Sequence, residues 1–258
     1  HTHGNEAPSC SNKRLQRNPR FGALLPKFRR ADEKLSVFGA SMKAIILAAG
    51  RGARLAPLTD TTPKPLLPIN GQPLIVRQLQ QLRAANITNV VINLYHLGEL
   101  IERALGDGEK FGMQIGYSHE QSLLETGGGI KNALPLLQDD EFIVCNGDIY
   151  TDFDFNTLPK ALEPNDTAHL VLTPTPKTRQ CGDFEYSQGR VTKRGDDFVY
   201  CGISIFSRRI FTNSPEGAFS SRDLMFEAIE KGQLSAQVHK GQWTDIGTLS
   251  DYSSVNSD

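Results

Sequence analysis

The residues best suited to chemistry lie in one stretch, residues 47–68, "LAAGRGARLAPLTDTTPKPLLP". Gly50 and Gly52 would let backbone N–H groups approach phosphate oxygens, and Arg54 and Lys64 would offset the phosphate charge. Lys64 stands between two prolines, which restrict the backbone on either side of it. A loop that only turned the chain would not need two cations held in this way. The stretch therefore predicts a site that binds a polyphosphate.

Two familiar phosphate-binding loops do not fit this stretch. A dinucleotide-binding loop needs G-x-G-x-x-G and an acidic residue about 20 positions later. Leu55 takes the place of the third glycine, and Asn70 lies where the acidic residue is expected. A Walker A loop needs Gly-Lys followed by Ser or Thr, and neither tripeptide occurs in the chain. A dehydrogenase is thus disfavoured, and the specific signal is G-x-G-x-R-L-x-P-L-T followed by P-K-P-L.

Two aspartates stand in patterns that suit a metal site. Asp148 closes the apolar run "EFIVCNGD", and Asp245 lies in "WTDIGT" near the end of the chain. Either residue alone would be read as a turn or helix-cap aspartate. Two converging carboxylates together with substrate phosphates would form the oxygen ligand set that Mg²⁺ prefers. The residues themselves leave the convergence of Asp148 and Asp245 open.

Alternating strands and helices must position these residues. Short apolar runs at residues 43–49, 89–94 and 141–148 predict buried strands, and residues 97–105 carry the stripe of an amphipathic helix. The alternation predicts an α/β fold with a mostly parallel central sheet. Ligands of such sheets collect beyond the carboxyl ends of the strands. Both the glycine loop and Asp148 follow such strand ends.

The second half of the chain has a different pattern. The segments "AHLVLTPTP", "GRVTKRG", "FVYCGISIFS" and "LSAQVHK" read as strands, and residues 222–232 are the one clear helix among them. We expect these strands to be mixed or antiparallel, to extend the sheet and to form a smaller antiparallel lid over its active edge. No apolar run approaches the roughly 20 residues that a membrane helix needs.

Composition excludes several classes of protein. The chain has 258 residues with 38% hydrophobic and 22% charged content, which is ordinary for a soluble globular protein. A net charge of −1 does not suggest a nucleic-acid-binding face. The four scattered cysteines suggest free thiols in a reducing cytoplasm.

The N-terminal segment differs from the rest of the chain. Residues 1–41 carry eight basic and three acidic side chains and show no clear periodicity. They also lack the apolar core of a secretory signal. We interpret them as a poorly ordered basic extension or an expression remnant, while a docking arm or a transit peptide stays open. Residues 42–258 are expected to form the functional domain.

On these motifs the chain resembles the sugar-1-phosphate nucleotidyltransferases over essentially the whole of residues 42–258. The glycine loop with its downstream lysine is the signature of that family. Residues 124–130, "LETGGGI", lie where the family has its second glycine-rich, base-binding segment. "NGD" and "WTDIGT" match the family's two metal-bearing segments. The resemblance implies the Rossmann-like, three-layer nucleotide-diphospho-sugar transferase fold, with Mg²⁺ held by Asp148 and Asp245.

The resemblance also implies roles for the phosphate-binding cations. Arg54 is expected to contact the β,γ-phosphates and the departing pyrophosphate, and Lys64 the α-phosphate and the incoming sugar phosphate. Because the attacking phosphate oxygen is already largely ionised, catalysis would consist of alignment and charge stabilisation. No general base is then required.

The base and the sugar are assigned to two further groups of residues. The nucleotide is expected along Leu47, Ala48, Ala49, Gly50, Gly52 and Arg54 on one side and along Glu120, Glu125, Thr126, Gly127 and Gly128 on the other. Glu125 stands where many family members have glycine. The sugar phosphate is expected at Lys64, Asn146, Gly182, Asp183, Lys193, Gly202 and Trp243. In their second half, longer family members carry a Glu-Lys-Pro motif whose residues touch the sugar. Its loss from this chain either makes room for a sugar with a bulky lactyl ether, such as N-acetylmuramate, or is neutral.

The substrates are suggested by the particular residues within these motifs. "ETGGG", "NGD" and "WTDIGT" in a short chain are most similar to the uridylyltransferases of peptidoglycan recycling. The resemblance therefore implies UTP and N-acetylmuramate α-1-phosphate, with release of pyrophosphate. Mannose 1-phosphate with GTP, or glucose 1-phosphate with dTTP, are the alternatives within the family, and a catalytically silent nucleotide-sugar sensor is the alternative outside it. We expect a monomer with no nucleic-acid or membrane partner.

Overall fold

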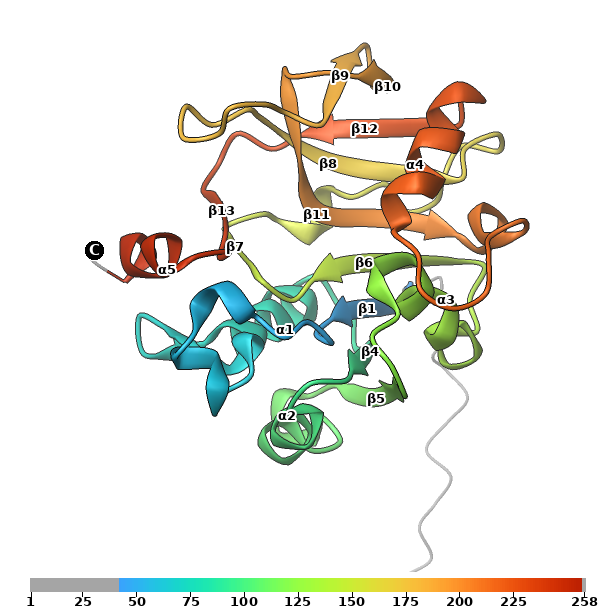
Figure 1. The fold of residues 1–258 in the computed structure, drawn as a ribbon. Helices are drawn as coiled ribbons and strands as arrows, with labels where there is room; N and C mark the ends of the chain where they lie inside the picture. Colours follow the sequence, from blue (N-terminus) through green and yellow to red (C-terminus); the bar gives the residue numbers. More distant parts are fainter. Residues whose placement is uncertain (1–41, 257–258) are drawn as a thin grey trace, which may run out of the picture. The chain divides into compact units, whose positions relative to one another are not determined.

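A nine-stranded mixed sheet runs through residues 42–256, the residues that the computed structural model describes (Figure 1). Its strands lie in the order β5-β4-β1-β6-β11-β8-β12-β10-β9. They are β1 (Ala44–Leu47), β4 (Asn89–Leu94), β5 (Gln114–His119), β6 (Glu141–Asn146), β8 (Ala168–Pro174), β9 (Phe184–Ser187), β10 (Arg190–Arg194), β11 (Phe198–Ser207) and β12 (Leu234–Val238). The interpretation of residues 1–41 as an extension lies outside the described range.

Helices and short ribbons complete the fold. The helices are α1 (Leu74–Ala84), α2 (Gly98–Leu105), α3 (Glu125–Leu137), α4 (Ser221–Glu230) and α5 (Leu249–Val255). The ribbons pair β2 (Pro68–Ile69) with β3 (Gln72–Pro73) and β7 (Ile149–Thr151) with β13 (Trp243–Asp245). Single 3₁₀ turns lie at Ala53–Leu55, Leu58–Asp60, Lys64–Leu66, Glu109–Phe111, Phe155–Thr157 and Arg208–Phe211. Within the described residues, no helix is both long and apolar enough to cross a membrane.

The first half of the sheet is parallel and is covered by helices on both faces. β4 runs parallel to β1 and β5, and β1 runs parallel to β6. Ile45 and Ile46 are both fully buried and belong to cores on opposite faces of the sheet. Helices α1 and α2 pack in the Ile46 core, and α3 and α4 pack in the Ile45 core. These three layers confirm the predicted α/β fold, since parallel strands need cover on both faces.

The second half extends the same sheet with mixed strand directions, as predicted. β11 is antiparallel to both β6 and β8, whereas β12 is parallel to β8. The hairpin β9–β10 forms the far edge. The register of β11 against β8 shifts between Tyr200 and Ser204, and Gly202 within this shift has a φ of 75°. Such irregularities bend a strand, and β11 curves visibly beside β6 (Figure 1).

Candidate active site

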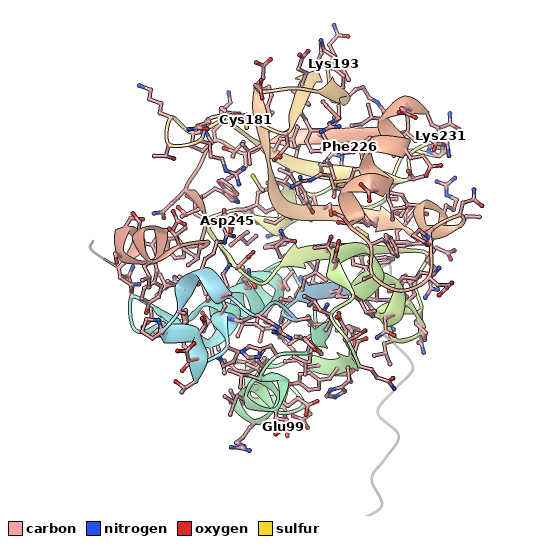
Figure 2. All side chains as sticks on the ribbon, in the orientation of Figure 1. Glu99, Cys181, Lys193, Phe226, Lys231 and Asp245 are labelled. Carbon is pink, nitrogen blue, oxygen red and sulfur yellow. The ribbon has the colours of Figure 1, made fainter. Side chains whose placement is uncertain are left out.

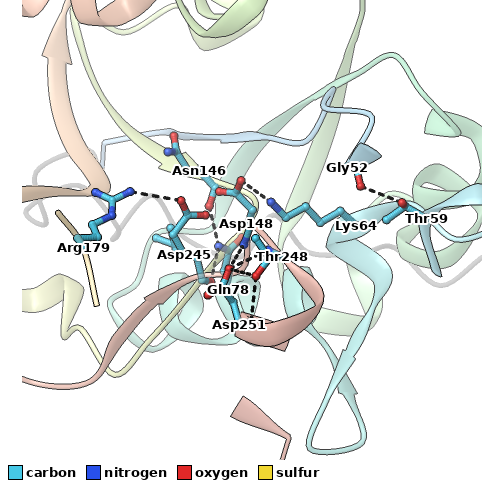
Figure 3. Close-up of polar contacts among 12 residues, drawn as sticks. Gly52, Thr59, Lys64, Gln78, Asn146, Asp148, Arg179, Asp245, Thr248 and Asp251 are labelled. Carbon is cyan, nitrogen blue, oxygen red and sulfur yellow. Dashed lines mark hydrogen bonds and ion pairs between the residues drawn. The ribbon is translucent and has the colours of Figure 1, made fainter. Parts of the chain in front are cut away.

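Asp148 and Asp245 come from distant segments and meet beside the end of β6. The ribbon β7–β13 pairs Asp245 with Ile149, the residue after Asp148. The N–H of Ile246 donates a hydrogen bond of 2.9 Å to the carbonyl oxygen of Asp148. The two carboxylates therefore share one site, which is drawn in Figure 3. Antiparallel pairing of two three-residue strands is what brings them together.

Cations surround this pair of carboxylates. Lys64 Nζ lies 2.7 Å from Asp148 Oδ2, and the lysine side chain is only 10% exposed. Burial raises the pKa of Asp245 above its usual range, and the charge of Asp148 adds to the shift. Lys64, Arg179 and Arg54 act in the opposite direction and lower that pKa. Two like charges held together in this way favour a bound cation, because it would relieve their repulsion.

Arg54 reaches the same region from the glycine loop. It lies in the 3₁₀ turn Ala53–Leu55, which follows Gly52 with its φ of 65°. Its guanidinium nitrogens lie 3.3 and 3.4 Å from the point that a Cβ on Gly247 would occupy. The side chain of Arg54 therefore rests against the backbone just after Asp245. Glycine at position 247 leaves the space that this contact needs.

A buried glutamine holds the turn that carries Asp148. Gln78 of α1 is 3% exposed, and its amide nitrogen donates to the carbonyl oxygens of Asn146 at 2.8 Å and Ile149 at 3.2 Å. Its Oε1 is buried without a hydrogen-bond partner among residues 42–256. We did not predict this residue. Its signal was a polar side chain at the position between Leu74 and Leu82 where the helix stripe is buried.

A chain of hydrogen bonds connects the two predicted nucleotide-binding segments. The N–H of Ala48 donates to Asn93 Oδ1 at 2.7 Å, and Asn93 Nδ2 donates to Glu120 Oε1 at 2.7 Å. Glu120 Oε2 then accepts from the N–H of Leu124 at 2.9 Å. Burial raises the pKa of Glu120 above its usual range, while the hydrogen bonds from Leu124 and Asn93 act the other way. Asn93 was missed, although it was a polar residue inside a buried strand.

A cleft opens between these two segments, on the side where the nucleotide is predicted to bind. Its lining includes Leu47, Ala49, Gly50, Glu125, Thr126 and Asp148. Five of these were expected to touch the nucleotide, and Asp148 connects the cleft to the carboxylate pair. Glu120 does not line the cleft but supports it through Asn93, which does.

Gly127 and Gly128 face a different neighbour. Both of their N–H groups donate to the carbonyl oxygen of Phe219, at 2.8 and 3.2 Å. A Cβ on Gly127 would lie 2.3 Å from the ring of Phe219, and one on Gly128 would lie 2.2 Å from the oxygen of Gly217. These glycines thus let α3 pack tightly against residues 217–219. Their contact with the base stays a prediction. The positions that their side chains would take are occupied by Phe219 and Gly217.

A second cleft of about 190 Å³ adjoins the first and shares Thr126, Asn146 and Ser220 with it. Four residues that were predicted for the sugar phosphate line it, namely Asn146, Asp183, Gly202 and Trp243. A Cβ on Gly202 would lie 2.9 Å from Asn146 Cβ, so the close approach of β11 to β6 requires glycine here.

Two other residues from the sugar prediction lie outside this cleft. Lys193 is on β10, where its side chain is 67% exposed and pairs with Glu185 at 3.1 Å. Figure 2 shows it at the far edge of the sheet from Asp245. Gly182 packs against Asp196 and Thr175, and a Cβ on it would lie 2.6 Å from an oxygen of each. The structure therefore does not group Lys193 and Gly182 with the other site residues.

Two arginines in the second cleft were not predicted. Arg179 lies in the segment between β8 and β9, with guanidinium nitrogens 3.8 Å from both Asp183 Oδ2 and Asp245 Oδ2. Its guanidinium also lies 5.8 Å from the centre of the Trp243 ring. Arg222 lines the cleft from the first turn of α4. No sequence motif marks either residue.

The fold and the site together define a class of protein. Residues 43–258 match the model of the nucleotidyl transferase family. The chain belongs to that family. A loop with cations facing paired carboxylates beyond a parallel sheet is the arrangement expected for nucleotidyl transfer.

Individual relatives within the family differ in how similar they are to this chain. N-acetylmuramate alpha-1-phosphate uridylyltransferase of Neisseria meningitidis serogroup B is 42% identical over 217 residues, which cover 81% of this chain and 94% of that protein. Mannose-1-phosphate guanylyltransferase of Mycobacterium tuberculosis is 31% identical, and the match covers 81% of this chain but 62% of that protein. UTP–glucose-1-phosphate uridylyltransferase of Synechocystis is 29% identical, with 82% of this chain and 61% of that protein covered.

Solved structures agree on the fold. A putative glucose-1-phosphate thymidylyltransferase from Bacillus anthracis matches with a TM-score of 0.73 at 23% identity, covering 84% of this chain and 94% of that one. HddC from Yersinia pseudotuberculosis, solved with GMP-PN, matches with a TM-score of 0.70 at 24% identity, covering 84% of this chain and 98% of that one. At this level of identity the likeness concerns the fold.

Proposed function

We propose that the chain transfers UMP from UTP to N-acetylmuramate α-1-phosphate and releases pyrophosphate, in peptidoglycan recycling. The observation that carries this proposal is the convergence of Lys64, Asp148 and Asp245 where the two clefts adjoin. The choice of substrates is supported by the Neisseria relative, because this chain matches nearly its full length. The guanylyltransferase and the glucose-1-phosphate enzyme are less similar and are matched over less than two thirds of their length.

The reaction needs alignment more than acid–base chemistry. An oxygen of the sugar phosphate attacks the α-phosphorus of UTP, a new P–O bond forms, and the bond to the β-phosphate oxygen breaks. The attacking oxygen is already ionised, so no side chain has to remove a proton. Lys64 would hold the α-phosphate and the sugar phosphate in line, and Arg54 would offset the charge of the departing pyrophosphate. We also propose that the chain acts as a monomer.

The carboxylate pair fits Mg²⁺. Among the described residues, no group of three or more His, Cys, Asp or Glu side chains gathers, so the protein would provide Asp148 and Asp245. Mg²⁺ commonly takes one or two carboxylates together with substrate phosphates and waters. When bound, it would supply positive charge and orient the phosphate oxygens. The three described cysteines are free thiols, which supports a reducing cytoplasmic location.

A substrate grid tests the proposal. Pyrophosphate release would be measured with Mg²⁺ for N-acetylmuramate, mannose and glucose 1-phosphates, each against UTP, GTP and dTTP. The expected result is the highest kcat/KM for N-acetylmuramate 1-phosphate with UTP. Preference for mannose 1-phosphate with GTP would overturn the substrate assignment. Nucleotide binding without turnover in any combination would instead indicate a sensor.

A further inference from the structure

The second cleft contains one cation whose charge is not balanced by the protein. Four charged residues line it, namely Arg179, Asp183, Arg222 and Asp245. Arg179 lies 3.8 Å from each aspartate and so serves both of them. Within residues 42–256, no hydrogen bond or ion pair reaches the guanidinium of Arg222, and its side chain is exposed to the cleft and to solvent.

Arg222 and Asp245 line this cleft from two different elements. Asp245 closes β13, which pairs with β7, whereas Arg222 lies in the first turn of α4, which packs with α3 and β10. Figure 1 shows β13 and α4 on either side of the curved strand β11. A sugar phosphate held by Lys64 and by Mg²⁺ at Asp148 and Asp245 would leave its ring in this cleft, which Arg222 also lines.

We infer that Arg222 binds a carboxylate on the sugar, so that the second cleft selects acidic sugar 1-phosphates. A guanidinium presents a planar pair of donors that matches a carboxylate. The first turn of a helix also favours negative charge, and α4 is ten residues long. The inference rests on the proposed function, in which the lactyl ether of N-acetylmuramate is the acidic group. It adds the residue that would distinguish this sugar from neutral N-acetylhexosamines.

The side chains around Arg222 suit a carboxylate that must be held in place. The hydroxyls of Thr126 and Ser221 are hydrogen bonded to each other at 3.0 Å, and both residues line the cleft. The N–H of Arg222 itself donates to Ser220 Oγ at 3.2 Å, which fixes the start of the helix. Met225 and Phe184 add apolar surface nearby. Among the described residues that line this cleft, Arg222 is thus the cation that the protein leaves unpaired.

A pair of substrates tests the inference. With UTP and Mg²⁺, kcat/KM would be measured for N-acetylmuramate 1-phosphate and for N-acetylglucosamine 1-phosphate, which lacks the lactyl carboxylate. Arg222→Gln should lower the value for the acidic sugar about 10- to 100-fold, as expected for a lost charge-assisted hydrogen bond. The value for the neutral sugar should fall far less. Arg222→Lys should restore part of the preference, because it keeps the charge but not the planar fork.

Controls and outcomes separate this inference from the proposed function. Arg103→Gln, which removes another exposed helix arginine, on α2, should change neither substrate. An equal loss for both sugars in Arg222→Gln would show that Arg222 acts on the shared phosphate and would overturn the inference, as would no loss for either. A wild-type enzyme that prefers the neutral sugar would also overturn it while leaving nucleotidyl transfer intact. Failure of the proposed function would be seen differently, as no uridylyl transfer to any sugar.

Discussion

The proposed nucleotide side and the proposed sugar side of the site are built in different ways. On the nucleotide side, one continuous loop after β1 supplies Gly50, Arg54 and Lys64, and the parallel strands place it at their carboxyl ends. On the sugar side, Asp183, Gly202, Arg222 and Trp243 each come from a different part of the chain. A phosphate can be held by contiguous backbone and cations, whereas a sugar pocket needs side chains from several directions. The first side is therefore visible in one sequence segment, whereas the second is assembled only by the fold.

The largest effect is expected at Lys64, where the two sides meet. Lys64→Gln removes the buried cation 2.7 Å from Asp148, so kcat should fall about 100-fold or more, as for loss of other transition-state charge stabilisation. Initial rates of pyrophosphate release would measure this. Lys231→Gln is the matched control, because Lys231 forms a comparable pair with Glu227 on the exposed surface of α4 (Figure 2). A similar rate for both variants would mean that Lys64 has only a structural role.

Alanine substitutions at one glycine on each side should affect the free energy of unfolding differently. Gly202→Ala places a side chain at a φ of 75° and 2.9 Å from Asn146, so the free energy of unfolding should fall by about 1–3 kcal/mol. Gly50→Ala meets no atom within 4 Å and should leave stability nearly unchanged. It should instead raise KM for the nucleotide, because its methyl group would enter the cleft in which we propose that the nucleotide binds. Urea unfolding and steady-state kinetics on both variants test this difference. An equal loss of stability in the two variants would contradict the prediction.

The smallest effect concerns a buried histidine in the second half of the sheet, outside both clefts. His169 of β8 is hydrogen bonded to Gln237 and Ser235, and burial lowers its pKa below 6.5. The folded state thus prefers neutral imidazole, while the unfolded chain takes up a proton as the pH falls below 6.5. Stability should therefore decrease between pH 7.5 and pH 5.5, and His169→Gln should reduce that decrease, as measured by urea unfolding at each pH. An unchanged pH dependence would mean that His169 titrates alike in both states.

The fold was predictable from the sequence because each strand or helix has a pattern within its own residues. Buried strands appear as apolar runs, and amphipathic helices appear as stripes with the helical period. The same is true of the phosphate loop, whose glycines and cations lie within one short segment. The meeting of Asp148 with Asp245 was implied by the family resemblance alone. It depends on the ribbon β7–β13, and no local sequence pattern predicts that pairing.

The rest of the site could not be predicted because its signals are not local. Gln78 and Asn93 are single polar residues in apolar elements, and only their tertiary partners show what they hold. Arg222 lies beside other candidate residues only because α4 lines the second cleft. Lys193 shows the opposite case, since its place in the stretch that corresponds to the family's Glu-Lys-Pro motif suggested a sugar ligand, while its strand belongs to the hairpin at the outer edge of the sheet.

The most direct test of the account is a double-mutant cycle on the two aspartates. Asp148→Asn, Asp245→Asn and the double variant would be compared by kcat at saturating Mg²⁺, with circular dichroism to verify that each variant is folded. If the two carboxylates act as one unit, each single change should lower kcat by at least about 100-fold, and the double change should cost little more. If instead either single variant keeps near-normal activity, or the two losses simply multiply, then Asp148 and Asp245 do not act together and the central claim is wrong.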